Sequence, residues 1–257
     1  KSNAWSNNYQ TFGSNGFTGS LTGSNISYTA TATDKKGVWE GNMGDLFVRQ
    51  TITLKNNKAY FIANITLKNT GLATLNRIYY MRTVDPDNEV SITNSFVTKN
   101  KIAFQLPNPY NKTLVTANGL TYPGQSYLGL GTKDCQAVCF YLRSGLIADG
   151  DLEQIYLGQS PNYAFADSST NDVGIGVLFN AGDLAPGDST TFSYAYILNP
   201  ADLDEAFAET DPGFMYNGNY YPSGSVIVAP TGSVLPISIV NGSYYNWTWS
   251  PGTGLNT

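Results

Sequence analysis

An acidic run, D-P-D-N-E at positions 85 to 89, holds the residues best suited to chemistry. Asp85, Asp87 and Glu89 alternate, so a loop that folds back here would gather three carboxylates around a hard cation, and calcium prefers such oxygen ligands. The run is not an EF-hand, because Val90 and Phe96 replace the invariant Gly and the bidentate Glu of that motif. The two interpretations are a calcium site and a solvated turn begun by Asp-Pro.

A second acidic run, D-G-D-L-E, repeats the same spacing at Asp149, Asp151 and Glu153. The glycine makes this run flexible. It follows an apolar stretch, which favours an ordinary surface loop. We therefore take it as the weaker of the two candidate calcium sites.

The only two cysteines, Cys135 and Cys139, lie four residues apart. On a straight strand their Cα atoms would be about 13 Å apart, at roughly 3.3 Å per residue. A disulfide allows no more than about 7 Å. The sequence leaves two alternatives: a disulfide across a bulge or turn, or two buried thiols.

The chain contains no histidine. This absence excludes Ser-His-Asp catalysis and zinc sites that use imidazole. Glycan cleavage by two carboxylates would need an acid pair about 5 to 10 Å apart across a cleft, and the sequence singles out no such pair. We nominate no catalytic residue and expect a protein that is not an enzyme.

Aromatic residues are abundant, with 18 tyrosines among them. The pair Tyr220 and Tyr221 would place one ring on each face of a strand, and Trp247 and Trp249 alternate in the same way. Outward rings of this kind either pack on another domain or subunit, or stack on sugars whose hydroxyls bind neighbouring amides. Both interpretations predict a surface that makes contacts.

The segments that must position these residues read almost entirely as strands, because apolar and polar residues alternate between turns rich in Gly, Asn and Asp. A predicted hairpin joins Leu46–Leu54 to Ala59–Lys68, and a third long strand follows at Leu75–Val84. The other expected strands are 26–33, 102–106, 127–132, 138–143, 174–179 and 189–198.

One helix is expected, from Ala201 to Glu209, with Asn199 as its N-cap and Pro200 in the first helical position. We predict an all-β fold: a large antiparallel two-sheet β-sandwich with this short helix, covering residues 1–212. Residues 213–257 are expected to be a linker and the start of a second, incomplete immunoglobulin-like module, with short strands at 225–229 and 234–240.

The charge composition of the chain limits the kinds of partner that we expect it to bind. Charged residues make up 13% of the chain and the net charge is −5, a neutral-polar balance typical of extracellular β proteins. Nucleic acids and anionic membranes attract clustered Lys and Arg. We therefore expect no nucleic acid partner. No run of apolar residues is long enough for a spanning helix, and we expect no membrane insertion.

The final stretch, Y-N-W-T-W-S-P-G-T-G-L-N at positions 245 to 256, resembles the start of the polycystic-kidney-disease-type (PKD) and immunoglobulin-like repeats of very large secreted surface proteins of Bacteroidota. Gly252 occupies the variable position of their T-W-S-P-x-T-G-L pattern. The segments at 67–71, 79–87 and 184–194 resemble non-catalytic β-sandwich regions of secreted bacterial surface proteins. Asp188-Ser189-Thr190 matches the short O-glycan attachment pattern of that phylum, which makes Ser189 a candidate glycosylation site.

This resemblance implies a non-catalytic, extracellular structural or adhesive segment of a large cell-surface or fibre-forming adhesin. The expected partners are other domains of the same long chain, other subunits of a fibre, and glycans. The alternatives are a carbohydrate-binding β-sandwich module and a carboxylate-based glycan-cleaving enzyme. The alternating tryptophans of the last strand need cover, which we expect from a longer chain or from another subunit.

Overall fold

The structure is a computed structural model. It describes residues 21–106, 111–122, 126–142, 152–159, 163–164, 168–211, 213–216, 219–222, 226–230 and 232–240. None of the helices in these ranges has the length and apolar character needed to cross a lipid bilayer.

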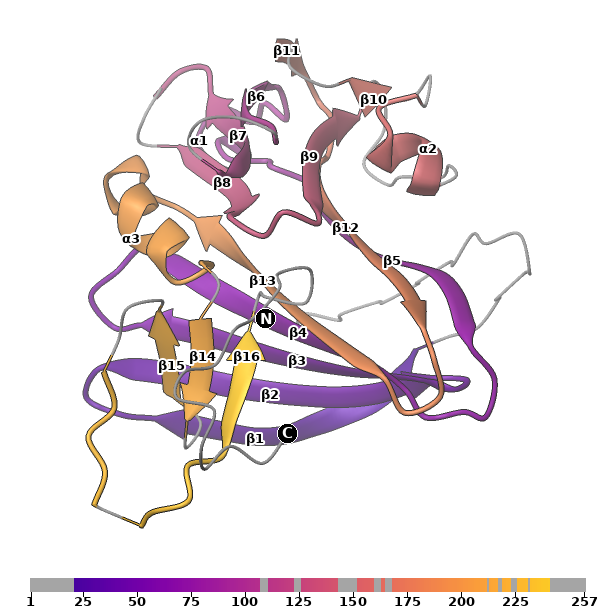
Figure 1. Cartoon of the computed structure of the whole chain (residues 1–257). Coiled ribbons are helices and arrows are strands. Elements are labelled where there is room, and N and C mark those ends of the chain that lie inside the picture. The colour runs from indigo at the N-terminus through magenta and orange to yellow at the C-terminus, as the bar shows by residue number, and fades with distance from the viewer. Residues whose placement is uncertain are drawn as a thin grey trace.

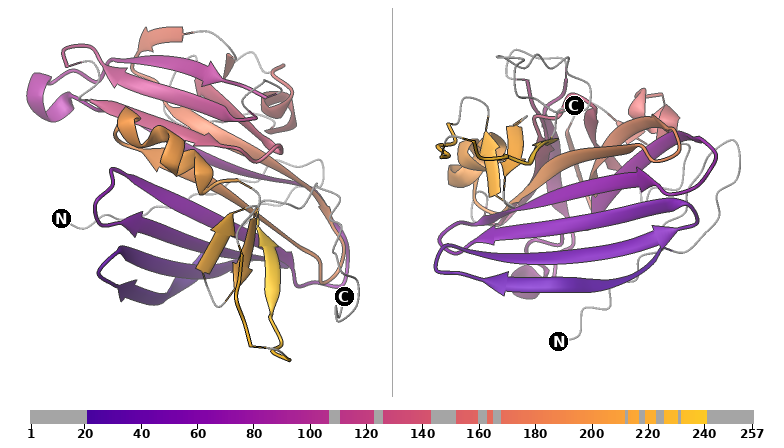
Figure 2. Two further views of the ribbon diagram at one scale, coloured as in Figure 1. Left: turned by 60° about the vertical axis from the view of Figure 1, so that its left-hand side comes forward. Right: turned by 60° about the horizontal axis from the view of Figure 1, so that its bottom comes forward.

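The larger of the two main sheets has nine strands, and all its recorded strand pairs are antiparallel. Figures 1 and 2 show β1 to β4 at one end of the molecule and β6 to β8 at the other, with β13 between them. In spatial order the strands are β1 (Thr22–Ala30), β2 (Asp34–Met43), β3 (Leu46–Lys55), β4 (Tyr60–Asn69), β13 (Ser189–Ile197), β8 (Tyr127–Thr132), β7 (Thr113–Gly119), β6 (Thr98–Phe104) and β11 (Ser168–Asn171).

A second antiparallel sheet packs against this one, and a small third sheet follows it in the chain. The second contains, in order, β10 (Tyr163–Ala164), β9 (Ala137–Leu142), β12 (Ile175–Leu184) and β5 (Leu75–Val84). The third contains β15 (Asn219–Pro222), β14 (Gly213–Tyr216) and β16 (Ile237–Val240). The predicted all-β, two-sheet sandwich is confirmed.

Short helical segments lie between the strands along the described part of the chain. They are α1 (Val90–Thr93), α2 (Leu152–Tyr156), the 3₁₀ turn η1 (Pro200–Asp202) and α3 (Leu203–Ala208). The expected cap is present, because Oδ1 of Asn199 accepts the Ala201 N–H at 3.0 Å. The helix is shorter than predicted, since its first turn is 3₁₀.

The core between the two main sheets is built on aromatic rings. Phe192 and Phe179 face each other from β13 and β12, with ring centroids 4.2 Å apart. Tyr80 and Tyr194 pack on them, and their hydroxyls lie 3.2 Å apart. The alternation of Phe192, Tyr194 and Tyr196 therefore marks the inner face of β13, as period two requires.

A smaller core covers the other face of the large sheet. Ala206 and Phe207 of α3 pack there on Tyr60, Ile62 and Ile197. This contact fixes the helix against the middle of the sheet. It also explains why β4 and β13 are buried on both faces.

The described strands differ from the predictions in several places. No strand was expected at β7, β10 or β11. β2 was not expected, because its residues are rich in charge and glycine, yet it pairs along its full length with β3. The strand expected at 225–229 is wrong: residues 226–230 belong to no strand, whereas β14 and β15 form where a linker was predicted. The predicted strand at 234–240 begins only at Ile237.

Candidate functional site

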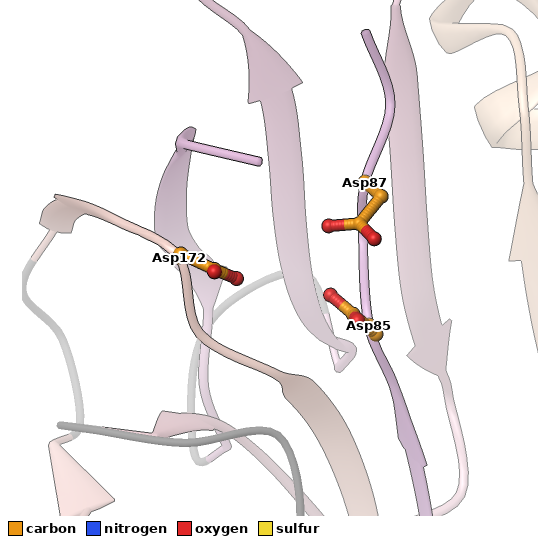
Figure 3. Close-up of side chains that lie close together, drawn as sticks. All are labelled: Asp85, Asp87 and Asp172. Atoms are coloured by element: carbon orange, nitrogen blue, oxygen red, sulfur yellow. The ribbon is translucent and has the colours of Figure 1, made fainter. Parts of the chain in front are cut away.

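The first acidic run is divided by the fold into two separate environments. Asp85 and Asp87 follow β5, and Asp172 precedes β12, whose Ile175 is paired with Val84 of β5. That pairing brings Asp172 to the acidic run from a distant part of the sequence. Oxygen atoms of the three aspartates lie within 4.8 Å of one another, and Figure 3 shows the side chains pointing toward a shared space. We call Asp85, Asp87 and Asp172 the aspartate cluster.

Electrostatics in the aspartate cluster is unfavourable without a cation. Burial raises the pKa of Asp85 to about 6, and the charges of Asp87 and Asp172, together with a hydrogen bond to Asp87, add to the shift. Oδ1 of Asp87 is buried and has no hydrogen-bond partner among the described residues. Carboxylate oxygens in this arrangement suit a hard divalent ion such as calcium. Among the described residues, this is the only group of three carboxylate or thiol side chains close enough together to hold a metal ion.

Glu89 does not join the cluster, so the prediction that it is the third calcium ligand is wrong. Glu89 is 2% exposed, and its carboxylate accepts the N–H of Thr121 at 2.9 Å and the N–H of Tyr122 at 2.7 Å. Burial alone would raise the pKa of Glu89, but these hydrogen bonds outweigh it and the pKa is lowered. Glu89 is therefore a structural anion that holds the loop after β7.

The surrounding loop is built around this carboxylate. Nδ2 of Asn88 donates to the carbonyls of Ala117 and Ser126, at 2.9 and 3.0 Å. A Cβ on Gly119 would overlap the Glu89 carboxylate, so this position needs glycine. The end of β5 is thus tied to the connection between β7 and β8.

The second acidic run contributes one described residue. Asp149 and Asp151 lie outside the described residues. Glu153, at the start of α2, forms an ion pair with Arg77. The backbone N–H of Arg77 in turn donates to Asp183 at 2.7 Å. Glu153 therefore joins α2 to β5. It is the only acid of the second acidic run that the structure describes, so the weaker calcium prediction stays a prediction.

Cys135 and Cys139 are not joined by a disulfide. Cys135 is exposed in the turn between β8 and β9, and Cys139 is buried in β9, where its Sγ lies 3.5 Å from the Leu130 carbonyl. Burial raises the pKa of the Cys139 thiol to about 12. The predicted disulfide is therefore wrong. The alternative of two buried thiols is correct for Cys139 and wrong for Cys135.

The same turn contains a buried acid that sequence reasoning missed. Asp134 is 1% exposed, and its Oδ1 accepts the N–H of Gln136 at 2.9 Å. Its Oδ2, like Oε1 of Gln136, has no hydrogen-bond partner among the described residues. Burial raises the pKa of Asp134 to about 7, although the Gln136 hydrogen bond opposes the shift. No pattern in the neighbouring sequence marks Asp134 as a buried acid.

Of the four aromatic residues predicted to make surface contacts, two lie in described strands and two do not. The ring of Tyr221 stacks on Phe214 within the small sheet, with centroids 5.4 Å apart. Tyr220 lies in β15, and Trp247 and Trp249 lie outside the described residues. Ser189, the candidate glycosylation site, is exposed at the start of β13, which is an interior strand of the large sheet.

Two hollows on the surface are depressions over neighbouring strands. One, of about 440 Å³, is lined by Asn25 to Tyr28 of β1 and by Gly37 of β2. The other, of about 360 Å³, lies over β6 and β7 and the residue that follows them, with Lys99 and Lys101 on its border. Neither is lined by a carboxylate, and neither lies between two facing elements.

No protein-family model matches this chain, and no curated protein matches it.

Proposed function

We propose that this chain is a non-catalytic, extracellular structural or adhesive segment of a large cell-surface or fibre-forming protein. The observation that carries the proposal is where the exposed sheet, the surface hollows and the carboxylates lie on the molecule. The described part of the chain offers a large, partly uncovered sheet and two carboxylate-free hollows. Its one group of three carboxylates within 4.8 Å of one another lies where β5 ends and just before β12 begins, and two of the three residues are exposed. Such a surface suits contacts with other proteins better than chemistry on a substrate.

The sequence supports the same function independently. A chain without histidine and with few charges has a surface that is neutral and polar. The stretch from 245 to 256 resembles the start of a repeat found in large surface proteins. A two-sheet sandwich is a common spacer and adhesion unit in such proteins, although fold by itself does not determine function.

Antibodies against the purified chain would test the proposal on the source cells. We expect them to label intact cells without permeabilisation and to detect a polypeptide much larger than 27.8 kDa on an immunoblot. Labelling that requires permeabilised cells would refute the extracellular assignment. A single band at the mass of this chain would refute the assignment as a segment.

Binding of glycans is the second candidate, and one observation favours it. Tyr28 is 68% exposed beside the first hollow, next to Asn25, and a side chain at Gly37 would meet open space. A ring and an amide around open space could hold a sugar. A glycan array compared between the wild-type chain and Tyr28→Ala tests it: retention that depends on Tyr28 supports binding, and no retained glycan removes the candidate.

A further inference from the structure

Strand β1 leaves the large sheet open at one side. Among the described residues it is the outermost strand on that side, and all nine of its residues are exposed. None of them is charged and none is proline, although proteins commonly protect sheet edges with both. A bulge at Asn25 to Ser27 interrupts the pairing with β2, but Ser27 to Ala30 are in regular register. At the opposite side, β11 has only four residues.

A separate segment of the same chain has the complementary property. Residues 226–229, Val-Ile-Val-Ala, lie in the connection between β15 and β16 and belong to no strand. Figure 1 shows this yellow-coloured connection projecting beyond the small sheet. Val226 is 81% exposed and Val228 is 92% exposed, whereas Ile227 and Ala229 are half-buried. The segment thus has the two-residue alternation of a strand, and no strand among the described residues pairs with it.

The edge and the segment fit each other in length, polarity and charge. Each offers four consecutive residues: Ser27–Ala30 are in regular register with β2, and 226–229 alternate between exposed and half-buried. The chain has a net charge of −5, so two copies repel each other, yet neither segment carries a charged residue. Pairing them would place exposed valines beside Ile26 and Tyr28, which are 54% and 68% exposed. Uncovered apolar groups of this kind favour association.

We propose that residues 226–229 of one copy add as an outer strand to β1 of a second copy of this chain. Backbone hydrogen bonds would form the ladder, and the apolar side chains would be covered on both sides of it. This rests on the proposed structural function, of which it names the partner. Because the two surfaces differ, the contact is heterologous and can continue from copy to copy as a filament or close as a ring.

One such contact is small. Four added residues bury less than the roughly 1,200 Å² of a standard stable interface. Association of the separate chain is therefore weak and depends on concentration. Repetition along an assembly would strengthen it without any new type of contact.

Two double variants separate donor from acceptor. Ile26→Glu/Tyr28→Glu blocks the edge, and Val226→Glu/Val228→Glu blocks the added segment. All four side chains are more than half exposed, so both variants should fold. Sedimentation velocity up to about 0.5 mM, with a reductant because Cys135 is exposed, measures association. We expect the wild-type chain to form dimers and larger species, each variant alone to associate at least about tenfold more weakly, and an equal mixture of the two to form dimers only.

Each other result overturns the proposal. A wild-type chain that stays monomeric shows that the edge accepts no second copy. If the segment-blocked variant still associates alone, β1 pairs with itself. If the edge-blocked variant still associates alone, the segments pair with each other. The control, Leu72→Glu/Leu157→Glu, adds the same charge at exposed leucines elsewhere and should associate like the wild type. Because these measurements do not involve cells, their failure leaves the surface assignment to the antibody experiment.

Discussion

The two halves of the first acidic run show how differently neighbouring carboxylates behave. Glu89 is buried, yet two backbone N–H groups meet its two oxygens and its pKa is lowered. Asp85 lies four residues earlier, faces two other aspartates and has a raised pKa. Burial acts to raise the pKa of both carboxylates. Hydrogen bonds from backbone N–H groups outweigh it at Glu89, whereas the charges of Asp87 and Asp172 add to it at Asp85. One half of the run stabilises the fold, and the other carries the calcium prediction.

Glu89→Gln should give the largest loss of stability. The side-chain amide would place its NH₂ against one of the two N–H donors, so one hydrogen bond would be replaced by a buried clash of donors. We expect Tm to fall on the order of 5–10 °C near neutral pH. Thermal unfolding followed by circular dichroism measures the change.

The pH dependence checks the cause of that loss. Because the pKa of Glu89 is lowered in the folded state, its contribution is present above the pKa of the unfolded chain, near 4.5, and is lost as pH falls through the lower, folded-state pKa. The difference in Tm between the wild type and Glu89→Gln should therefore shrink under acidic conditions. A difference that stays constant down to pH 3 would show that shape, rather than charge, is what Glu89 contributes.

Asp134→Asn should have the opposite sign. Asp134 is buried with one oxygen unpaired, and the pKa of about 7 means that the folded protein resists its ionisation. The wild-type chain loses stability as pH rises from about 4 to about 7, and the variant does not. We expect the variant to be more stable by about 1–3 kcal/mol at pH 8, with the gain vanishing near pH 4.

Urea unfolding at the two pH values measures that gain. Asp188→Asn, at an exposed position, is the matched control and should change little. Equal stability of Asp134→Asn and the wild type at pH 8 would show that the unpaired oxygen has a partner, such as bound water. Glu89 and Asp134 would then differ in what meets their oxygens: backbone N–H groups at Glu89 and bound water at Asp134.

How far the sequence predicts this contrast depends on which interactions are local. Alternation predicted strand β13, and Asn199 predicted the cap of η1, because both signals lie within a few residues. The aspartate cluster depends on the pairing of Ile175 with Val84, and Glu89 depends on the loop after β7. Both contacts join residues far apart in the chain, so no short sequence pattern predicts them. The D-x-D-x-E spacing therefore located the acidic loop and misassigned one of its members.

Calcium tests the aspartate cluster directly. Without calcium, Asp172→Asn should raise stability slightly, by ~0.5 kcal/mol, because it removes one of three like charges at a largely exposed position. With calcium, the wild type should gain up to about 2.7 kcal/mol at 100 times the dissociation constant, and the variant much less. Melting curves with a chelator and with calcium give both comparisons. Identical curves for the wild-type chain would remove the calcium prediction.

Glu153→Gln should have the smallest effect, and it separates the two acidic runs. Glu153 forms an ion pair with Arg77, and both side chains are well exposed, so its removal should cost no more than ~0.5 kcal/mol. High salt should abolish that cost, since at about 1 M the screening length is near 3 Å. The calcium response of the variant should equal that of the wild type. A calcium response that disappears in Glu153→Gln but survives in Asp172→Asn would move the calcium site to the second acidic run. The aspartate cluster would then be an ordinary loop, in which protonation alone relieves the repulsion between the carboxylates.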